Sequence, residues 1–311
     1  MLRLRRLLFT TDYTAGAERA FSHAAYLAAL HGAELHVLHA VAAPRPGPLD
    51  RLDEVRITAE EVAEQLRLPT EAPAPGEPVA LVEVEREGAD SADVVLDYVR
   101  EADVDLVVMG THGRRGLDRL LSGSVAEAVV RRAPCPVLVV PPGSDPAGPI
   151  RRILAPVDFS EAAHEAARHA HALATRYGAR LDLLHVVDET LLRPAYVPLL
   201  GSFQVGEAEA VARAQMQLRE LAQDLGDGDI SVCALVGHPA LTILDVADAE
   251  ETDLLVIGSH GRSGIERLVL GSVAERVLRA ARCPVFVLKS YGRLLLGALP
   301  PAAAETPTAA V

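Results

Sequence analysis

With 311 residues, half of them apolar, the chain is long enough for two domains that each bury a core. Its formal net charge of −13 argues against a general nucleic-acid binder, and no apolar run reaches the roughly 20 residues of a membrane span. Three cysteines and an N-terminal apolar run too short for export favour a reduced, cytoplasmic protein, in which Cys135 and Cys283 are expected to be buried structural thiols.

Strands and helices are predicted to alternate along the first half of the chain. Short apolar runs indicate strands, Ala-rich or amphipathic stretches indicate helices, and Gly32 is a plausible helix stop. The expected strands span residues 6–11, 34–41, 79–86, 104–110 and 135–140, and the expected helices span residues 15–31, 50–68, 92–102 and 123–132.

The second half repeats this order, with Gly178 as the corresponding helix stop. The expected strands span residues 153–157, 180–187, 230–236, 252–258 and 283–288, and the expected helices span residues 161–177, 206–225, 241–250 and 271–281. Alternating strands and helices predict an α/β fold with parallel strands, helices on both faces and a doubly wound topology in each half.

An internal duplication explains why the two halves agree. The segment "GTHGRRGLDRLLSGS" at residues 110–124 returns as "GSHGRSGIERLVLGS" at residues 258–272, and 19 of the 31 positions from residue 110 to residue 140 are identical. A period this long indicates a duplicated domain. The Pro/Gly stretch between the copies predicts domains at residues 1–141 and 150–290, a linker at residues 142–149 and a disordered tail at residues 291–311.

The glycine segment has the pattern G-x2-G-x9-G-S and directly follows the fourth predicted strand of each half. Glycines let a backbone approach a ligand closely, and a helix that begins at the Gly-Ser pair offers free N–H groups to an anion. The alternative is that these glycines only make tight turns. No P-loop, dinucleotide fingerprint or nucleophile elbow is present, and "HEAARH" at residues 164–169 lacks zinc-ligand spacing.

These motifs resemble the universal stress protein family, with two family domains in tandem. The resemblance covers about residues 4–141 and 150–289, and both glycine segments look like the family's ATP-binding signature. It implies a five-stranded parallel sheet per half, of the adenine nucleotide alpha hydrolase-like type, and dimers joined through the last strands. The tandem should therefore form an intramolecular pseudo-dimer, and a further homodimer is left open.

The resemblance also implies one nucleotide site per half, with ATP as the expected ligand and accompanying Mg²⁺ left open. No catalytic residue or metal ligand is expected. The carried-over binding residues are Asp12, Val41, Met109, Gly110, Gly113, Gly123, Ser124 and Val125 in the first half and Asp158, Val187, Ile257, Gly258, Gly261, Gly271, Ser272 and Val273 in the second.

Three functions are compatible with this pattern. The leading hypothesis is a cytoplasmic, ATP-binding stress-response protein that acts by ligand-dependent conformation or partner choice. The alternatives are a slow ATPase or phosphotransferase, for which no general base is visible, and a nucleotide-free interaction module with vestigial sites. The first half departs from the family pattern at Thr10 and Thr11, where the second has Pro156 and Val157, so the second site is the better match.

Overall fold

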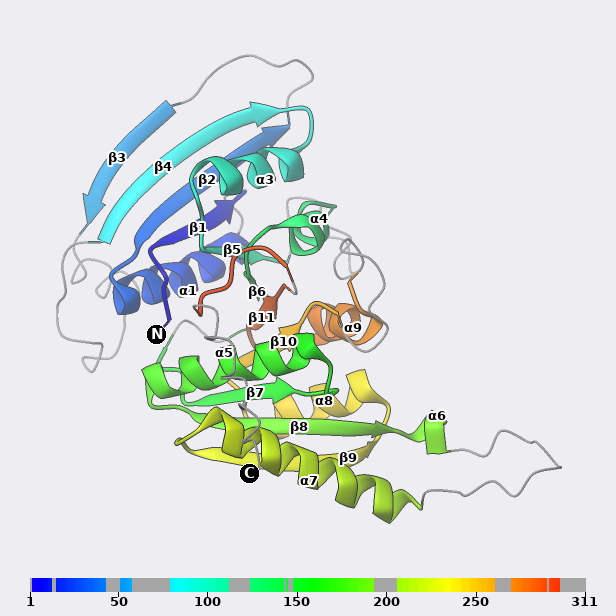
Figure 1. Ribbon diagram of the computed structural model, residues 1–311. Coiled ribbons are helices and arrows are strands. Elements are labelled where there is room, and N and C mark those ends of the chain that lie inside the picture. The colour runs from blue at the N-terminus through cyan, green and yellow to red at the C-terminus, as the bar shows by residue number, and fades with distance from the viewer. Residues whose placement is uncertain are drawn as a thin grey trace, which may run out of the picture.

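Figure 1 shows the computed structural model, which describes residues 2–12, 15–42, 51–57, 79–111, 124–142, 144, 148–192, 206–260, 270–289 and 291–296. The first half contains β1 (Arg6–Thr11), α1 (Ala15–His31), β2 (Glu34–Ala42), β3 (Arg51–Ile57), β4 (Val79–Gly88), α3 (Ser91–Glu101), β5 (Leu106–Gly110), α4 (Ser124–Arg132) and β6 (Val137–Val140). The second contains β7 (Arg152–Pro156), α5 (Glu161–Tyr177), β8 (Arg180–Asp188), α6 (Glu189–Leu192), α7 (Glu207–Leu225), β9 (Ile230–Gly237), α8 (Pro239–Ala249), β10 (Leu254–Gly258), α9 (Ser272–Ala280) and β11 (Val285–Leu288).

The described strands form one sheet of 11 strands in the order β3-β4-β2-β1-β5-β6-β11-β10-β7-β8-β9. Within each half, five strands run parallel, which confirms the α/β fold predicted from the sequence. The halves join where β6 pairs antiparallel with β11 and Phe286 lies opposite Leu138. The last strands are therefore adjacent, as the expected pseudo-dimer requires, and each covers the other's open edge.

The expected helix over residues 50–68 is wrong at its start. Residues Arg51–Ile57 form β3, which pairs antiparallel with the outer edge of β4. A strand edge with unpaired N–H and C=O groups favours such an addition, and Val55 and Ile57 have high β propensity. Tertiary pairing thus overrides the helical pattern, while residues 58–68 lie outside the described part of the chain.

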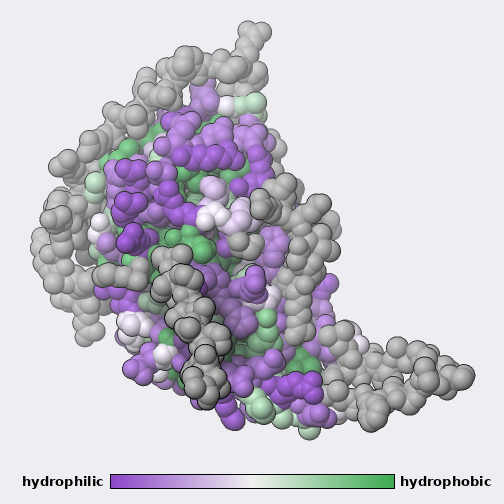
Figure 2. Space-filling model, viewed as in Figure 1, coloured by the Kyte–Doolittle hydropathy of each residue, from purple (hydrophilic) through white to green (hydrophobic). Residues whose placement is uncertain are grey.

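Helices on both faces of the sheet enclose two apolar clusters. One cluster lies under α1, α5 and α7 and the other under α3, α4, α8 and α9, and both continue from one half into the other. Successive side chains of β1 point to opposite faces of the sheet, so that Leu7 and Phe9 join the first cluster and Leu8 joins the second. Figure 2 shows hydrophilic residues dominating one outer face, with smaller hydrophobic patches between them.

Two glycines end helices as expected. Gly32 after α1 and Gly178 after α5 have φ angles of 61° and 65°, the left-handed conformation that favours glycine at this position. Of the described helices, none combines the length and the apolar content that a membrane crossing requires.

Residues 291–296, here called the C-terminal segment, return to the first half. The Arg293 N–H donates to the Pro134 carbonyl (2.7 Å), the Arg3 N–H donates to the Leu295 carbonyl (2.8 Å), and Leu295 is buried. The Arg293 guanidinium contacts Asp103 (2.7 Å) and Asp105 (2.9 Å). The predicted disorder is therefore wrong for this segment, which apolar burial and ion pairing hold in place, and residues 297–311 lie outside the described part.

Part of the predicted linker is also packed. Ser144 is buried, its N–H donates to the Pro141 carbonyl (3.1 Å), and its hydroxyl donates to the Arg282 carbonyl (3.2 Å). The connection between the halves is thus attached to the second half rather than free along its whole length.

Candidate functional site

The sheet changes its direction of strand addition between β1 and β5, and again between β7 and β10. In an open α/β sheet, ligands bind beyond the carboxyl ends of the strands at such a switch point. Gly110 ends β5 and Gly258 ends β10, so both glycine segments begin at switch points. Asp12 and Asp158 follow the neighbouring strands β1 and β7, which brings these predicted site residues to the same edge.

A tight turn joins β7 to α5 at this edge. The Asp158 Oδ1 accepts hydrogen bonds from the Ser160 N–H (3.0 Å) and from the Ser160 hydroxyl (2.6 Å). Ser160 is the N-cap of α5, and its Oγ accepts from the Ala163 N–H (3.2 Å). Asp158 therefore shapes the turn. Phe159 has a φ of 63°, which is unusual for a bulky residue.

Gly258 lies against the start of α5. A Cβ atom at this position would be 3.1 Å from the carbonyl oxygen of Ala162, tighter than nearly all real Cβ contacts. The absence of a side chain lets the end of β10 approach the first turn of α5, and so brings Gly258 near the turn at Asp158. Gly258 thus has a packing role whether or not a ligand binds.

The N-terminus of α9 lies beside the end of β10. Gly271 is the N-cap, and its N–H donates to the Ser259 carbonyl (2.9 Å), so the two ends of the glycine segment meet. The N-cap supplies no side-chain hydrogen bond to the first turn of the helix, and Ser272 is exposed there. The first N–H groups of α9 and the positive end of its dipole therefore face outward at the switch point, where they suit an anion.

Each half places a histidine against the carboxyl end of its first strand. The Nδ1–H of His185 in β8 donates to the Val157 carbonyl (2.6 Å), and that of His39 in β2 donates to the Thr11 carbonyl (2.8 Å). The His185 ring also lies 4.5 Å from that of Phe159, measured between centroids. Sequence reasoning missed these residues, although the repeated Leu-His pair in the two aligned strands was a usable signal.

The remaining predicted residues differ in how they can meet a ligand. Met109 and Ile257 are buried in the second apolar cluster, which leaves their backbone for contact. Val125 and Val273 lie in the first turns of α4 and α9 and pack partly on that cluster.

Val41 and Val187 lie near the carboxyl ends of β2 and β8, opposite Glu87 and Val236. Ser124 is the first residue of α4. Gly113, Gly123 and Gly261 lie outside the described residues.

The described residues give little support for a cysteine nucleophile or a metal site. Burial raises the pKa of Cys135 and of Cys283 to about 12, and it also raises the pKa of Cys233, so these thiols resist ionisation. His164 and His169 each bond the carbonyl four residues earlier in α5. Within the described part of the chain, no group of three or more His, Cys, Asp or Glu residues is arranged to hold a metal ion.

Comparison with known proteins gives consistent matches. The sequence model of the universal stress protein family matches residues 3–141 and 149–289. A universal stress protein of Mycolicibacterium smegmatis is 31% identical over 294 residues, covering 91% of this chain and 96% of that protein. One from Methanocaldococcus jannaschii is 36% identical over 142 residues, covering 45% of this chain and 82% of that protein.

Among solved structures, a universal stress protein from Archaeoglobus fulgidus has a TM-score of 0.62 at 21% identity, covering 93% of this chain and 97% of that one, which supports the fold. The duplicated sequence, the two switch points and the double match of the family model therefore agree that the chain belongs to the universal stress protein family, as a tandem of two family domains.

Proposed function

We propose that the chain binds ATP, one molecule per half, and acts as a ligand-dependent regulatory or interaction module in the stress response. One observation carries this proposal: among the described residues no side chain caps the N-terminus of α9, and the Gly271 N–H bond to the Ser259 carbonyl holds that N-terminus beside the end of β10. The family resemblance of the two glycine segments supplies the class of ligand.

In the second half, the N–H groups of Ser272 and Val273 would bind phosphate oxygens at the positive end of the α9 dipole, and Mg²⁺ would accompany the phosphates. The nucleoside would lie between the turn at Asp158 and the end of β8, where Val187 is partly exposed. In the first half, Asp12, Val41, Gly110 and the start of α4 would have the same roles.

The contacts in the second half favour binding over proton transfer. The Asp158 Oδ1 is held by Ser160, and the His185 Nδ1–H is held by the Val157 carbonyl. Both groups have a structural role around the switch point, and neither is placed against a described nucleophile that it could deprotonate. We therefore propose a binding protein rather than a phosphotransferase.

The test measures ATP binding to the full chain by equilibrium dialysis, with and without Mg²⁺. Ser272→Glu places a negative charge where phosphate would bind, yet an acidic residue in the first turn of a helix favours that helix. Ser272 is exposed, so the change removes no packing. We expect the second site to lose at least about tenfold in affinity, or about 1.4 kcal/mol, without a fall in thermal stability.

Ser272→Gln is the matched control, since it has nearly the same size and no charge, and it should keep most of the affinity. Ser124→Glu makes the corresponding change in the first half, and the double variant should lose both sites. Absence of saturable binding to the unmodified chain at tens of micromolar ATP would support the nucleotide-free alternative. Equal affinity of Ser272→Glu and the unmodified chain would show that ATP binds elsewhere.

A further inference from the structure

A cavity lies between the two halves, away from both switch points. Its volume is about 790 Å³, which is within the range of small-molecule sites. It is lined from the first half by α1, from the second by the amino ends of β7, β10 and β11, and by the start of the C-terminal half at residues 148–151. The proposed nucleotide sites lie at the carboxyl ends of these strands, at the opposite edge of the sheet.

The inner wall has an apolar part beside its charged groups. Leu27 of α1, Leu138 of β6, Phe286 of β11 and Leu173 of α5 line it and are buried, and Leu295 of the C-terminal segment lies among them. Two tyrosines add ring surface, and their hydroxyls are already used. The Tyr177 hydroxyl bonds His31 Nε2 (3.0 Å), and the Tyr26 hydroxyl is hydrogen-bonded to the backbone of Ile150. The wall therefore suits a hydrocarbon or aromatic body.

Most charged groups of the lining have partners. Arg152 pairs with Glu250 (2.8 Å), and Arg180 pairs with Asp182 (2.9 Å). Arg282 lies 3.4 Å from Asp248, and the Asp253 carboxylate accepts the N–H groups of residues 151 and 152. Glu251 lies on the exposed surface at the rim.

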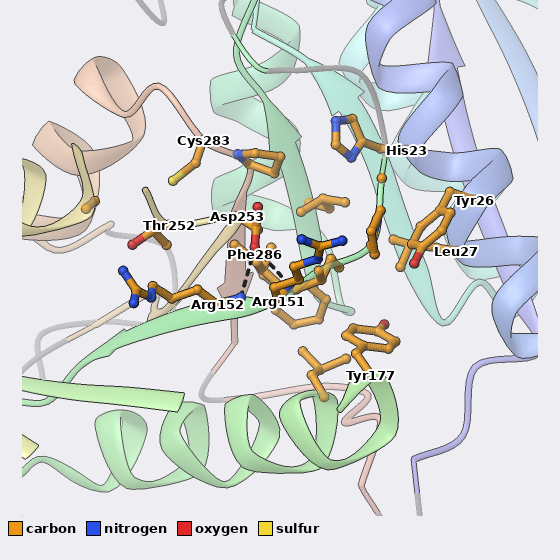
Figure 3. A pocket seen from close by; sticks show the side chains of 18 of the residues that line it. His23, Tyr26, Leu27, Arg151, Arg152, Tyr177, Thr252, Asp253, Cys283 and Phe286 are labelled. Atoms are coloured by element: carbon orange, nitrogen blue, oxygen red, sulfur yellow. Dashed lines mark hydrogen bonds between the residues drawn. The ribbon is translucent and has the colours of Figure 1, made fainter. Parts of the chain in front are cut away.

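One charged group of the lining remains available to a ligand. Arg151 is exposed, its guanidinium has no ion pair or side-chain hydrogen bond to any described residue, and Figure 3 shows it among the other lining side chains. Thr252 is 7% exposed, and its Oγ1 is buried without a hydrogen-bond partner. A buried hydroxyl without a partner costs free energy, and because the Thr252 Oγ1 has almost no accessible surface, it affects the stability of the cavity wall rather than contact with an occupant.

We propose that this cavity binds an amphipathic monocarboxylate. The Arg151 guanidinium would pair with the carboxylate in the bidentate geometry that guanidinium groups favour. The apolar body would lie against Leu27, Leu138 and Phe286. Because both halves supply lining residues, an occupant would contact both domains at once.

The test uses the full chain and two probes of equal length, decanoate and decanol, with binding followed by calorimetry. Decanoate should bind saturably with one molecule per chain, and at least tenfold more tightly than decanol. Arg151→Met keeps the length of the side chain and removes its charge, and should weaken decanoate binding at least tenfold while leaving decanol unchanged. Arg151→Lys should recover much of the affinity.

Two further variants separate a binding role from a structural one. Arg282→Met removes an exposed arginine at the rim that already lies near Asp248, and should bind decanoate normally. Thr252→Val replaces the unpaired hydroxyl by a methyl group of similar size. It should raise the melting temperature of the ligand-free protein and leave decanoate affinity unchanged, because the Thr252 Oγ1 is not accessible from the cavity.

Three results would overturn the proposal: no saturable decanoate binding below millimolar concentration, equal affinity for decanoate and decanol, or equal affinity of Arg151→Met and the unmodified chain. The comparison of the two probes needs no variant, so it holds even where a variant folds poorly. Ser272→Glu should bind decanoate normally, and loss of decanoate binding there would assign it to the nucleotide site instead.

Discussion

Lys289 is the most deeply buried cation of the described residues. It directly follows β11, at the junction of the two halves, and is only 2% exposed. It forms no hydrogen bond or ion pair with another described residue, and burial lowers its pKa from 10.5 to about 8, with Cys135 nearby opposing the shift slightly. The folded state thus binds the proton less tightly than the unfolded state does. Its charge opposes folding below pH 8, and this penalty is relieved as the pH rises from 8 toward 10.5.

We expect Lys289→Met to raise the free energy of unfolding at pH 7 by about 2–3 kcal/mol, because methionine fills similar space without a charge. The difference in free energy of unfolding between the variant and the unmodified chain should shrink by about half by pH 9.5. At that pH the folded lysine is neutral, and the unfolded lysine begins to lose its proton as well. Urea denaturation at both pH values measures this difference. Arg279→Met, which removes an exposed cation from α9, should show little change at either pH. A difference for Lys289→Met that stays constant with pH would mean that Lys289 titrates normally.

At the residue scale, the sequence was most informative where a backbone conformation requires one residue type. Gly32 and Gly178 were identified as helix stops because few other residues tolerate the left-handed conformation. His39 and His185 were missed because each bonds a backbone carbonyl of a different strand, and a carbonyl has no sequence signature. The burial of Lys289 has no signal in the local sequence either, since Cys135 of the other half is among its neighbours.

The C-terminal segment depends on one glycine. Gly292 has a φ of 87°, and a Cβ there would clash with the Pro134 carbonyl oxygen. The next residue, Arg293, donates its N–H to that same carbonyl. The close approach of two backbones therefore leaves no room for a side chain.

We expect Gly292→Ala to lower the free energy of unfolding by about 1–3 kcal/mol, through backbone strain and loss of the contact with Pro134. The N–H groups of Arg3 and Arg293 should also exchange with solvent faster, because both hydrogen bonds join the segment to the first half. Hydrogen exchange followed by mass spectrometry measures the second effect. Leu294→Ala changes an exposed neighbour and should alter neither quantity appreciably. Unchanged exchange in Gly292→Ala would contradict the importance of this contact.

At the element scale, prediction succeeded for helices with caps and regular apolar spacing. The bounds of α1 and α5 match those expected from residues 15–31 and 161–177. It failed for β3 and for the C-terminal segment, whose conformations depend on partners distant in sequence. Residues 51–57 are a strand because β4 has an open edge, and residues 291–296 are ordered because the first half provides Pro134 and Asp105 as partners.

At the scale of the whole molecule, the duplication predicted the pairing of the halves, since each had a final strand with an open edge. Both apolar clusters cross the junction between β6 and β11, so the halves share one core. The doubly wound topology predicted a switch point beside each glycine segment, and the observed strand order confirms that placement, while ligand binding there stays a prediction. The cavity between the halves was not, because its lining combines short pieces from seven or more places in the chain. No local pattern brings Leu27, Arg151 and Thr252 together.

The C-terminal segment also brings the two ends of the described chain together. Leu2 and Leu296 form an antiparallel bridge, and Figure 1 shows the start of the chain near the returning segment. The first and last described residues are thus close in space. Proteins with adjacent ends tolerate circular permutation when the new ends fall in exposed connections. We expect a permutant that joins residue 296 to residue 2 through a short glycine linker, and opens between Asp227 and Gly228 in the exposed turn after α7, to keep its circular dichroism spectrum and cooperative unfolding. Loss of cooperative unfolding would show that the order of synthesis, and not only the set of contacts, is needed to bring the two halves onto one sheet.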